Sequence, residues 1–517
     1  MHEIITLQLG QPSNYVATHF WNTQVRQPRS LILYTVIMVS RSVWHDDEEP
    51  TVDHNIHWRP GRGADGAETF LPRTVVYDLK GGFGSLRKIN ALYDPGDDPS
   101  AALSWDGASV THKLPSVAPT AYQQSLDAGL VPPELDESHV RYWSDFSRTF
   151  YHPKSLNQLY DYELNSSIRP FDKWPLGQEL FQSLDKEHDI ADRDFRPFVE
   201  EADQMQAIQV FTSLDDAWGG FAAEYLDRMR DEYPKATILV WGLHASQQSR
   251  LHLINVARST AALCEHASLV IPMRIPRAGL PSNVRLNSAS PWQTSALMAT
   301  AIETAGLSSR AKFGSSRYTL GHLTERLNQG GKQALARLQM SASASSAMPL
   351  EPHDSRAGKQ MASDEDLPLD IDLLDLAKTK PRPSPDHSHP HVFGREWTCR
   401  GWDSLARGQQ DEADVATSSA RTGRATEHVH SFDIAFPLLD SFPKIYTAQE
   451  TEPKEFVGVE TCLSTDSTVS EAVNGLRTLT TPLLGIEDRE NISNDLAELA
   501  EAYRDGWSSG SDDGDDS

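Results

Sequence analysis

Glycine loops that follow apolar stretches are the residues in this chain best suited to chemistry. Glycine allows backbone N–H groups to approach an anion closely, and the N-terminus of a following helix attracts negative charge. The pattern therefore indicates a phosphate site made of converging loops, although the same glycines could form turns only. Three apolar stretches end in such a loop: residues 3–9 before Gly10, residues 73–79 before Gly81 and Gly82, and residues 207–213 before Gly219 and Gly220.

The third of these loops carries side chains that disfavour phosphate. Asp215 and Asp216 place two carboxylates at its mouth, and Trp218 adds bulk. At an effective dielectric constant of about 20, one such charge about 4 Å from a phosphate oxygen costs roughly 4 kcal/mol. That cost cancels much of a micromolar affinity, which is worth about 8 kcal/mol. A bridging Mg²⁺ on the two aspartates is the alternative, but we expect no phosphate to be held here.

A histidine cluster is the other candidate for chemistry. His387, His389 and His391 lie near Cys399, and imidazole and thiolate groups are zinc ligands. The cluster lies in a Pro/Ser-rich stretch with a single cysteine nearby, so we interpret it as a solvated histidine run. No Ser-His-Asp grouping or zinc-protease motif is visible. The sequence therefore predicts neither a catalytic residue nor a metal site.

Strands alternating with helices would position these loops. Parallel α/β sheets show this alternation, and their ligands sit beyond the carboxyl ends of the strands. The three glycine loops should converge at that edge. The hydrophobic pattern predicts strands at 3–9, 73–79, 207–213 and 237–243, and helices at 15–24, 175–186, 221–232, 251–267 and 292–305.

Changes in composition divide the chain into five parts. We predict a nucleotide-binding-type α/β domain at 1–250 with an irregular insertion at 25–50, a helical connecting part at 251–340, a disordered linker at 341–392, a second α+β region at 393–505 and a disordered acidic tail at 506–517. Within the linker, DLPLDIDLLDLAK is alternatively a short acidic amphipathic helix for a partner. Residues 94–138 are expected to form a long loop.

The net charge and the cysteine content limit the classes of function and the cellular compartments that fit this chain. The chain has 517 residues and a formal net charge of −26, which repels nucleic-acid backbone and anionic lipid. Direct nucleic-acid binding is therefore not expected. Three separated cysteines fit a reducing compartment. The longest apolar run, LILYTVIMV, is too short for a transmembrane helix, and neither a signal peptide nor a mitochondrial presequence is visible.

Four stretches in matching order resemble tubulin. They are MHEIITLQLGQPSNYVATHFW, FLPRTVVYDLKGG, QVFTSLDDAWGGFAAEYLDRMRDEYP and LINVARSTAALCEH, and together they cover roughly the first 270 residues. The resemblance implies an α/β tubulin/FtsZ-like fold: a parallel Rossmann-like sheet domain followed by a smaller α+β region. It also implies a vestigial nucleotide site made of Gly10, Gln11, Asn14, Asp78, Gly81, Gly82, Gly219, Gly220 and Asn255. Read without the resemblance, Asp78 is a cap or loop residue and Asn255 an ordinary helix-surface residue.

Within that superfamily, the amino-acid sequence is similar to that of Misato proteins. The stretches VDHNIHWRPGRGADG, PRTVVYDLKGGFGSLRKINALY and YHPKSLNQL carry this likeness, as does the ending EAYRDGWSSGSDDGDD. For fungal members the resemblance implies a role in partitioning mitochondria and mitochondrial DNA. It also implies a mitochondrial location. The absence of a presequence favours the outer surface or the cytoplasm.

Several departures from tubulin argue against GTP hydrolysis. The tubulin loop Gly-Gly-Gly-Thr-Gly-Ser-Gly is replaced by residues 215–221, Lys80 stands where tubulin-like proteins carry an acidic residue, and Pro12 removes a backbone donor. The Asn-x-Asp sequence with which a neighbouring tubulin completes the site is absent. We expect a non-catalytic pseudo-GTPase scaffold without a cofactor, which binds protein partners such as tubulin or mitochondrial surface proteins. The alternatives are a GTP-binding or weakly hydrolysing GTPase and a cytoskeletal factor that binds tubulin.

Overall fold

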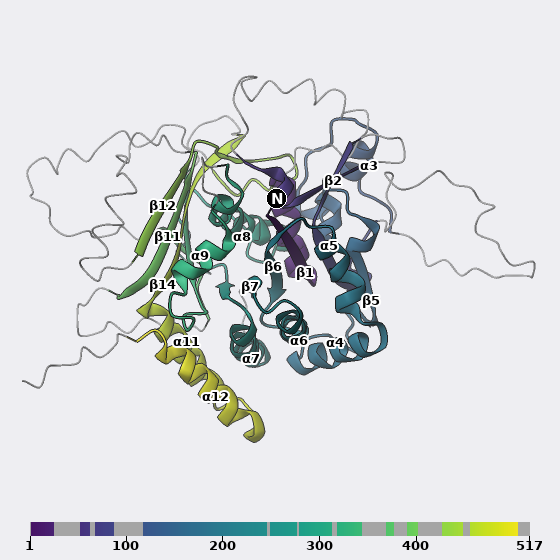
Figure 1. Cartoon of the computed structure of the whole chain (residues 1–517). Coiled ribbons are helices and arrows are strands. Elements are labelled where there is room, and N and C mark those ends of the chain that lie inside the picture. The colour runs from purple at the N-terminus through teal and green to yellow at the C-terminus, as the bar shows by residue number, and fades with distance from the viewer. Residues whose placement is uncertain are drawn as a thin grey trace, which may run out of the picture.

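A computed structural model describes the chain at residues 2–24, 52–62, 68–86, 117–245, 249–276, 279–312, 318–343, 369–376, 390–401, 426–447 and 455–504. The insertion predicted at 25–50, the tail predicted at 506–517, and His387 and His389 lie outside these residues. In the described part, two six-stranded sheets and their helices form layers (Figure 1).

The first sheet is parallel and has the order β5-β4-β1-β6-β7-β8. Its strands are β1 (Glu3–Leu9), β4 (Thr74–Lys80), β5 (Leu156–Glu163), β6 (Met205–Ser213), β7 (Thr237–Leu243) and β8 (Leu269–Met273). The middle strands are almost wholly buried, as expected when helices cover both faces of a parallel sheet. The chain runs outward from β1 in one direction and then returns to β6 to run in the other. The order reverses between β1 and β6, which is where α/β sheets bind ligands.

Helices lie on both faces of this sheet. α1 (Gln11–Gln24) and α8 (Pro291–Ala305) contact each other, while α6 (Ala217–Glu232) contacts both α4 (Trp174–His188) and α7 (Arg250–His266). Local signals set the helix starts: Asp216 caps α6 by accepting a hydrogen bond from the Trp218 N–H, and Ser249 caps α7 in the same way from the His252 N–H.

Short helices complete this half of the molecule. They are η2 (His54–Ile56), α3 (Ala121–Asp127), η3 (Glu137–His139), η4 (Trp143–Phe146), η5 (Pro153–Ser155), η6 (Ala191–Phe195), α5 (Arg196–Glu200), η7 (Leu307–Arg310) and α9 (Leu320–Leu327). The two strands β2 (Trp58–Arg62) and β3 (Glu68–Pro72) form an antiparallel ribbon. The long loop predicted at 94–138 therefore contains α3 and η3 in its described part.

The second sheet is mixed and has the order β10-β9-β14-β11-β12. Its strands are β9 (Arg337–Ser343), β10 (Ile371–Asp372), β11 (Val392–Arg400), β12 (Thr426–Phe432) and β14 (Phe456–Asp466), with β13 (Phe436–Pro437) paired to β14. Two helices follow, α11 (Ser467–Thr480) and α12 (Ile486–Glu501), and both pack on α7. The α/β tubulin-like architecture with a smaller α+β part is confirmed.

The linker predicted at 341–392 overlaps this sheet at both of its ends, where β9 ends and β11 begins, and in its middle. Ile371 and Asp372 form β10 and pair with β9, and the side chains of Ile371, Leu373 and Leu376 are buried. The structure therefore differs from the linker prediction, and from its helical alternative, at residues 369–376. The alternation of aspartate and apolar residues suggested an exposed segment, but tertiary contacts give its apolar side a partner.

α8 lies between the two sheets and joins them into one structure (Figure 1). Its residues are almost all buried, so it is a core helix without a solvent face. Glu303 on this helix forms ion pairs with Arg310 and with Arg400 of β11, and all three side chains are buried. Removing one partner of such a buried pair is strongly destabilising, so these contacts fix how the second sheet sits on α8.

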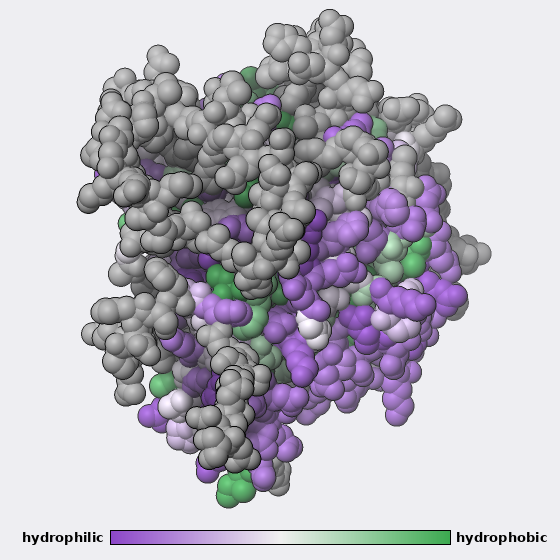
Figure 2. Space-filling model, turned by 60° about the vertical axis from the view of Figure 1, so that its left-hand side comes forward, coloured by the Kyte–Doolittle hydropathy of each residue, from purple (hydrophilic) through white to green (hydrophobic). Residues whose placement is uncertain are grey.

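The described surface is mainly polar on one face of the molecule. On the face shown in Figure 2, most of it is hydrophilic and apolar areas are small. Within the described ranges, no helix combines the length and hydropathy needed to cross a bilayer.

Candidate functional site

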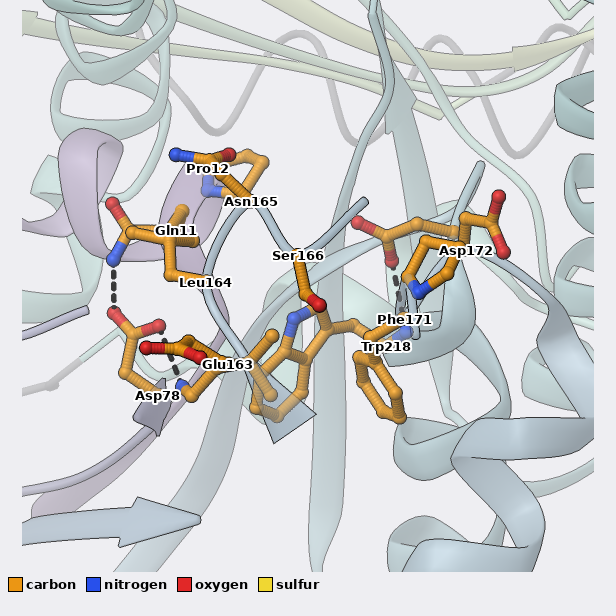
Figure 3. A pocket seen from close by; sticks show the side chains of 13 residues that line it. Gln11, Pro12, Asp78, Glu163, Leu164, Asn165, Ser166, Phe171, Asp172 and Trp218 are labelled. Carbon is orange, nitrogen blue, oxygen red and sulfur yellow. Dashed lines mark hydrogen bonds between the residues drawn. The ribbon is translucent and has the colours of Figure 1, made fainter. Parts of the chain in front are cut away.

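The loops after β1, β4 and β6 meet where the strand order reverses. Gly10 and Gln11 follow β1, residues 81–84 follow β4, and residues 214–218 lead from β6 into α6. A cavity of about 240 Å³ lies among them, and the loop 163–172 also lines it (Figure 3). The structure thus brings the sequence-predicted loops to one edge of the sheet.

Asp78 is the centre of a hydrogen-bond network in the first half of the site. Its carboxylate oxygen Oδ2 accepts from Gln11 Nε2 at 2.6 Å, Asn14 Nδ2 at 2.8 Å and Trp143 Nε1 at 3.0 Å. Its other oxygen accepts from the Leu79 backbone N–H at 2.8 Å. Gln11 also donates to the Gly82 carbonyl. Four donors on one buried carboxylate make a closed network in which Gln11 and Asn14 bind the protein itself.

Burial opposes these donors in setting the charge of Asp78. Loss of solvent raises the pKa of this carboxyl to about 6, while the hydrogen bonds from Asn14, Trp143, Leu79 and Gln11 act to lower it. At neutral pH the group is therefore mainly ionised and accepts all four bonds. Gly82 is glycine because a Cβ there would overlap the Asp78 carboxyl.

Trp218 fills the space beside the first loop. Its side chain is 3% exposed, and a Cβ added to Gly10 would overlap the indole ring. Gly10 also has a φ of +83°, which favours glycine. The indole meets Phe171 edge-on, with ring centroids 5.3 Å apart, and Figure 3 shows it between Asp78 and Phe171. An aromatic ring thus fills the space next to Gly10.

The start of α6 carries two aspartates, of which Asp215 is buried and Asp216 is half-buried. Asp216 accepts from the Trp218 N–H at 2.8 Å, and Asp215 accepts from the Ala245 N–H at 2.8 Å. Burial and the neighbouring Asp215 raise the pKa of Asp216 to about 8, and burial raises that of Asp215. These two N–H donors are therefore engaged by the protein's own carboxyl groups. An incoming phosphate would have to displace these carboxyl groups from the two donors.

Two family models match this architecture. The Misato Segment II tubulin-like domain matches residues 2–128, and the tubulin domain matches residues 132–311. Protein DML1 of Gibberella zeae is 46% identical over 528 residues, and protein dml1 of Aspergillus niger is 41% identical over 529 residues. Both alignments cover the whole of each chain. The chain belongs to the Misato family. Protein misato homolog 1 of Danio rerio is 26% identical over 65% of this chain and 63% of its own length.

In this Misato-family chain, the glycines of α6 serve close helix packing. A Cβ on Gly219 would overlap the Ser259 hydroxyl of α7, and a Cβ on Gly220 would overlap the Trp174 carbonyl at the start of α4. Both positions lie inside the first turn of α6, not in an open loop. Their small size therefore lets three helices approach one another.

The side chain of Asn255 likewise makes its hydrogen bonds within this Misato-family chain. Its amide donates to the backbone carbonyls of Asp172 and Asp215, and its oxygen accepts from the Trp174 N–H. The side chain is buried, so the reading of Asn255 as an ordinary helix-surface residue is wrong. These hydrogen bonds connect the loop before α4 to the loop before α6.

Gly81 and Lys80 do not line the cavity. Gly81 has a φ of +86° and open space around its Cα, so it is a turn glycine. Lys80 is the last residue of β4 and does not line the cavity.

Two further residues at this site, Trp143 and Phe171, were not predicted. Trp143 begins the short helix η4 and Phe171 lies in the loop before α4, and the partners of both are set by tertiary contacts. Their aromatic type was the only signal in the sequence.

Proposed function

We propose that this chain is a tubulin-like pseudo-GTPase that acts as a scaffold in the partitioning of mitochondria and mitochondrial DNA. One observation supports the loss of nucleotide chemistry above all others: the Trp218 indole packs against Gly10, where the tubulin resemblance puts the nucleotide. The mitochondrial role is supported by the family resemblance. Protein partners at the mitochondrial surface or in the cytoplasm would then be held by the outer faces of the fold.

The lining of the cavity supports the same conclusion. Among the residues that the structure describes, the carboxyl groups of Asp78, Glu163, Asp172 and Asp216 line the cavity beside Trp218, and no lysine or arginine does so. Nucleotide sites compensate phosphate with backbone donors, cations and metal. Here the donors of Gln11, Asn14 and the start of α6 are occupied by protein carboxyl groups.

The nucleotide content of the purified full chain tests this proposal. We expect no bound guanine nucleotide and no change in melting temperature with GTP or GDP, with or without Mg²⁺. A nucleotide at 100 times its Kd would stabilise a binding protein by about 2.7 kcal/mol, which is a shift of several degrees. Recovery of stoichiometric guanine nucleotide that is turned over would overturn the proposal.

A designed variant sharpens the result. Combining Trp218→Gly with Asp215→Asn and Asp216→Ser empties the space and removes both carboxylates, while serine keeps the helix cap. If only this variant gains affinity for GDP, the indole and the aspartates are the block. Replacing the chromosomal copy with Trp218→Phe, which keeps the site filled, should leave mitochondrial distribution unchanged. Depleting the chain should disturb both that distribution and the inheritance of mitochondrial DNA.

A further inference from the structure

The strand β12 forms one edge of the second sheet (Figure 1). Among the described strands it pairs with β11 alone, in a parallel register that runs from Gly394 with Thr426 to Arg400 with Phe432. A strand that pairs on one side leaves a row of backbone N–H and C=O groups on the other. We propose that an extended segment of a basic partner protein adds to β12 as a further strand.

The other described edges of the two sheets are short, broken or covered. β10 has only two residues. The pairing of β5 with β4 is irregular between Leu79 and Lys80. On β8, the Val270 N–H donates to the Ala334 carbonyl, and the Val270 carbonyl accepts from the Ala336 N–H. Short length, irregular pairing and a covering segment all protect a sheet edge from further pairing.

Among the described residues, β12 lacks such protection and is held in place from its inner side. Its sequence, TEHVHSF, contains neither lysine nor proline, and its register with β11 has no bulge. His430 Nε2 lies 3.2 Å from a carboxylate oxygen of the buried Glu396, and Phe432 is buried. A strand that is already ordered loses little conformational entropy when a partner pairs with it. The edge is therefore suited to strand addition, in which main-chain hydrogen bonds supply the affinity.

The side chains of the edge indicate what the added strand carries. Glu427, Val429 and Ser431 alternate along β12 and are exposed, and Val429 keeps 54% of its surface exposed. Trp397 of β11 is the register partner of Val429. Directly opposite residues share one face of a sheet and contact each other, so an apolar pair lies on this face. An apolar side chain beside Val429 is therefore favoured in the partner.

Charge favours a basic partner. Exposed carboxylates lie at both ends of β12, Glu427 at its start and Asp433 just after its end, although Arg395 lies 3.5 Å from the Glu427 carboxylate. The whole chain has a formal net charge of −26. Complementary charge speeds association and like charge opposes it, so a basic segment is favoured over a second copy of this acidic chain. This inference rests on the proposed scaffold role and names one surface that would hold a partner.

Hydrogen exchange and calorimetry on the full chain test the proposal with one synthetic peptide, Lys-Val-Lys-Val-Thr-Val-Lys-Val-Lys. In the free protein, alternate amides of residues 427–431 should exchange rapidly because they face away from β11. An excess of the peptide should slow the exchange of these amides about 10-fold or more. A peptide with glutamate in place of lysine should bind more weakly, and a peptide N-methylated throughout should not bind, because it lacks backbone donors.

Two matched variants locate the binding. Val429→Lys adds a positive charge to the edge and should weaken binding of the basic peptide about 5- to 10-fold. Val131→Lys makes the same change at an exposed valine outside the sheets and should leave the affinity unchanged. Both valines are exposed, so both variants should keep the melting temperature of the wild type.

Three kinds of result would overturn this inference alone. Slow exchange of every β12 amide in the free protein would mean that the edge is already covered, and protection that grows with protein concentration would assign the edge to a second copy. The third kind is a failure of the lysine peptide to bind, or equal binding of the N-methylated peptide or of the Val429→Lys protein. Stoichiometric binding of GTP would instead overturn the proposed function.

Discussion

The loops after β1 and β6 lie side by side at the same edge of the sheet, yet they are filled in different ways. The loop after β1 keeps polar side chains, and Gln11 and Asn14 both donate to Asp78. The loop after β6 carries Trp218 and two aspartates. The first loop thus belongs to an internal hydrogen-bond network, and the second is part of the core.

The difference shows two ways in which loops at this edge of a sheet are filled. A polar loop persists when a buried acceptor satisfies its donors, because an unpaired donor costs about 1–3 kcal/mol. A glycine loop has few side-chain donors, so an aromatic ring can occupy the space and gain the free energy of burial. Each half can be tested separately by removing the group that fills it.

Replacing Trp218 should have the largest effect. Trp218→Ala removes a buried indole that contacts Gly10, Phe171 and Phe221, and should lower the free energy of unfolding by about 3–5 kcal/mol. Chemical denaturation measures this change. Trp218→Phe, which keeps an aromatic ring, should cost less than about 2 kcal/mol. A loss below about 1 kcal/mol for the alanine variant would mean that the indole is not part of the core.

Replacing Asp78 should have an intermediate effect. In Asp78→Asn, whichever way the amide turns, its NH₂ group meets at least one N–H donor from the surrounding network. We expect the free energy of unfolding to fall by about 1–3 kcal/mol. The stability should also depend on pH, because the folded state raises the pKa of the Asp78 carboxyl to about 6. The free energy of unfolding of the wild type should therefore decrease as the pH rises from about 4 to 6, and the variant should lack this decrease. Equal stability of the two proteins at pH 7 would contradict the network.

Replacing Asp216 should have the smallest effect. The effect should be visible in how steeply the free energy of unfolding changes with pH. Its pKa is raised to about 8 in the folded chain, so the folded state binds the proton more tightly than the unfolded state. The free energy of unfolding should therefore decrease as the pH rises from about 4 to 8. Asp216→Asn and Asp216→Ser both keep a helix cap, and either should reduce the difference between pH 6 and pH 7 by about 1 kcal/mol. An unchanged slope in both variants would show that Asp216 does not titrate in this range.

Several elements could be predicted from the sequence because their signals are local. The strands at 3–9 and 237–243 have the predicted bounds, and α7 begins and ends within one residue of its prediction. β5 was missed because it is an edge strand whose buried and exposed positions do not alternate regularly. α6 begins at Ala217 instead of 221, because the two glycines suggested a turn while Asp216 was the cap.

The sequence by itself determined the parallel α/β fold, the convergence of the glycine loops and the excess of negative charge at the third loop. These follow from hydrophobic periodicity and residue type, which act over a few neighbouring residues. Only the tertiary structure decided what fills the site: Trp143 and Phe171 reach it from distant segments, Asn255 turns inward, and Ile371 joins the second sheet. Such contacts depend on which surfaces packing brings together, and no local pattern in the chain encodes that choice.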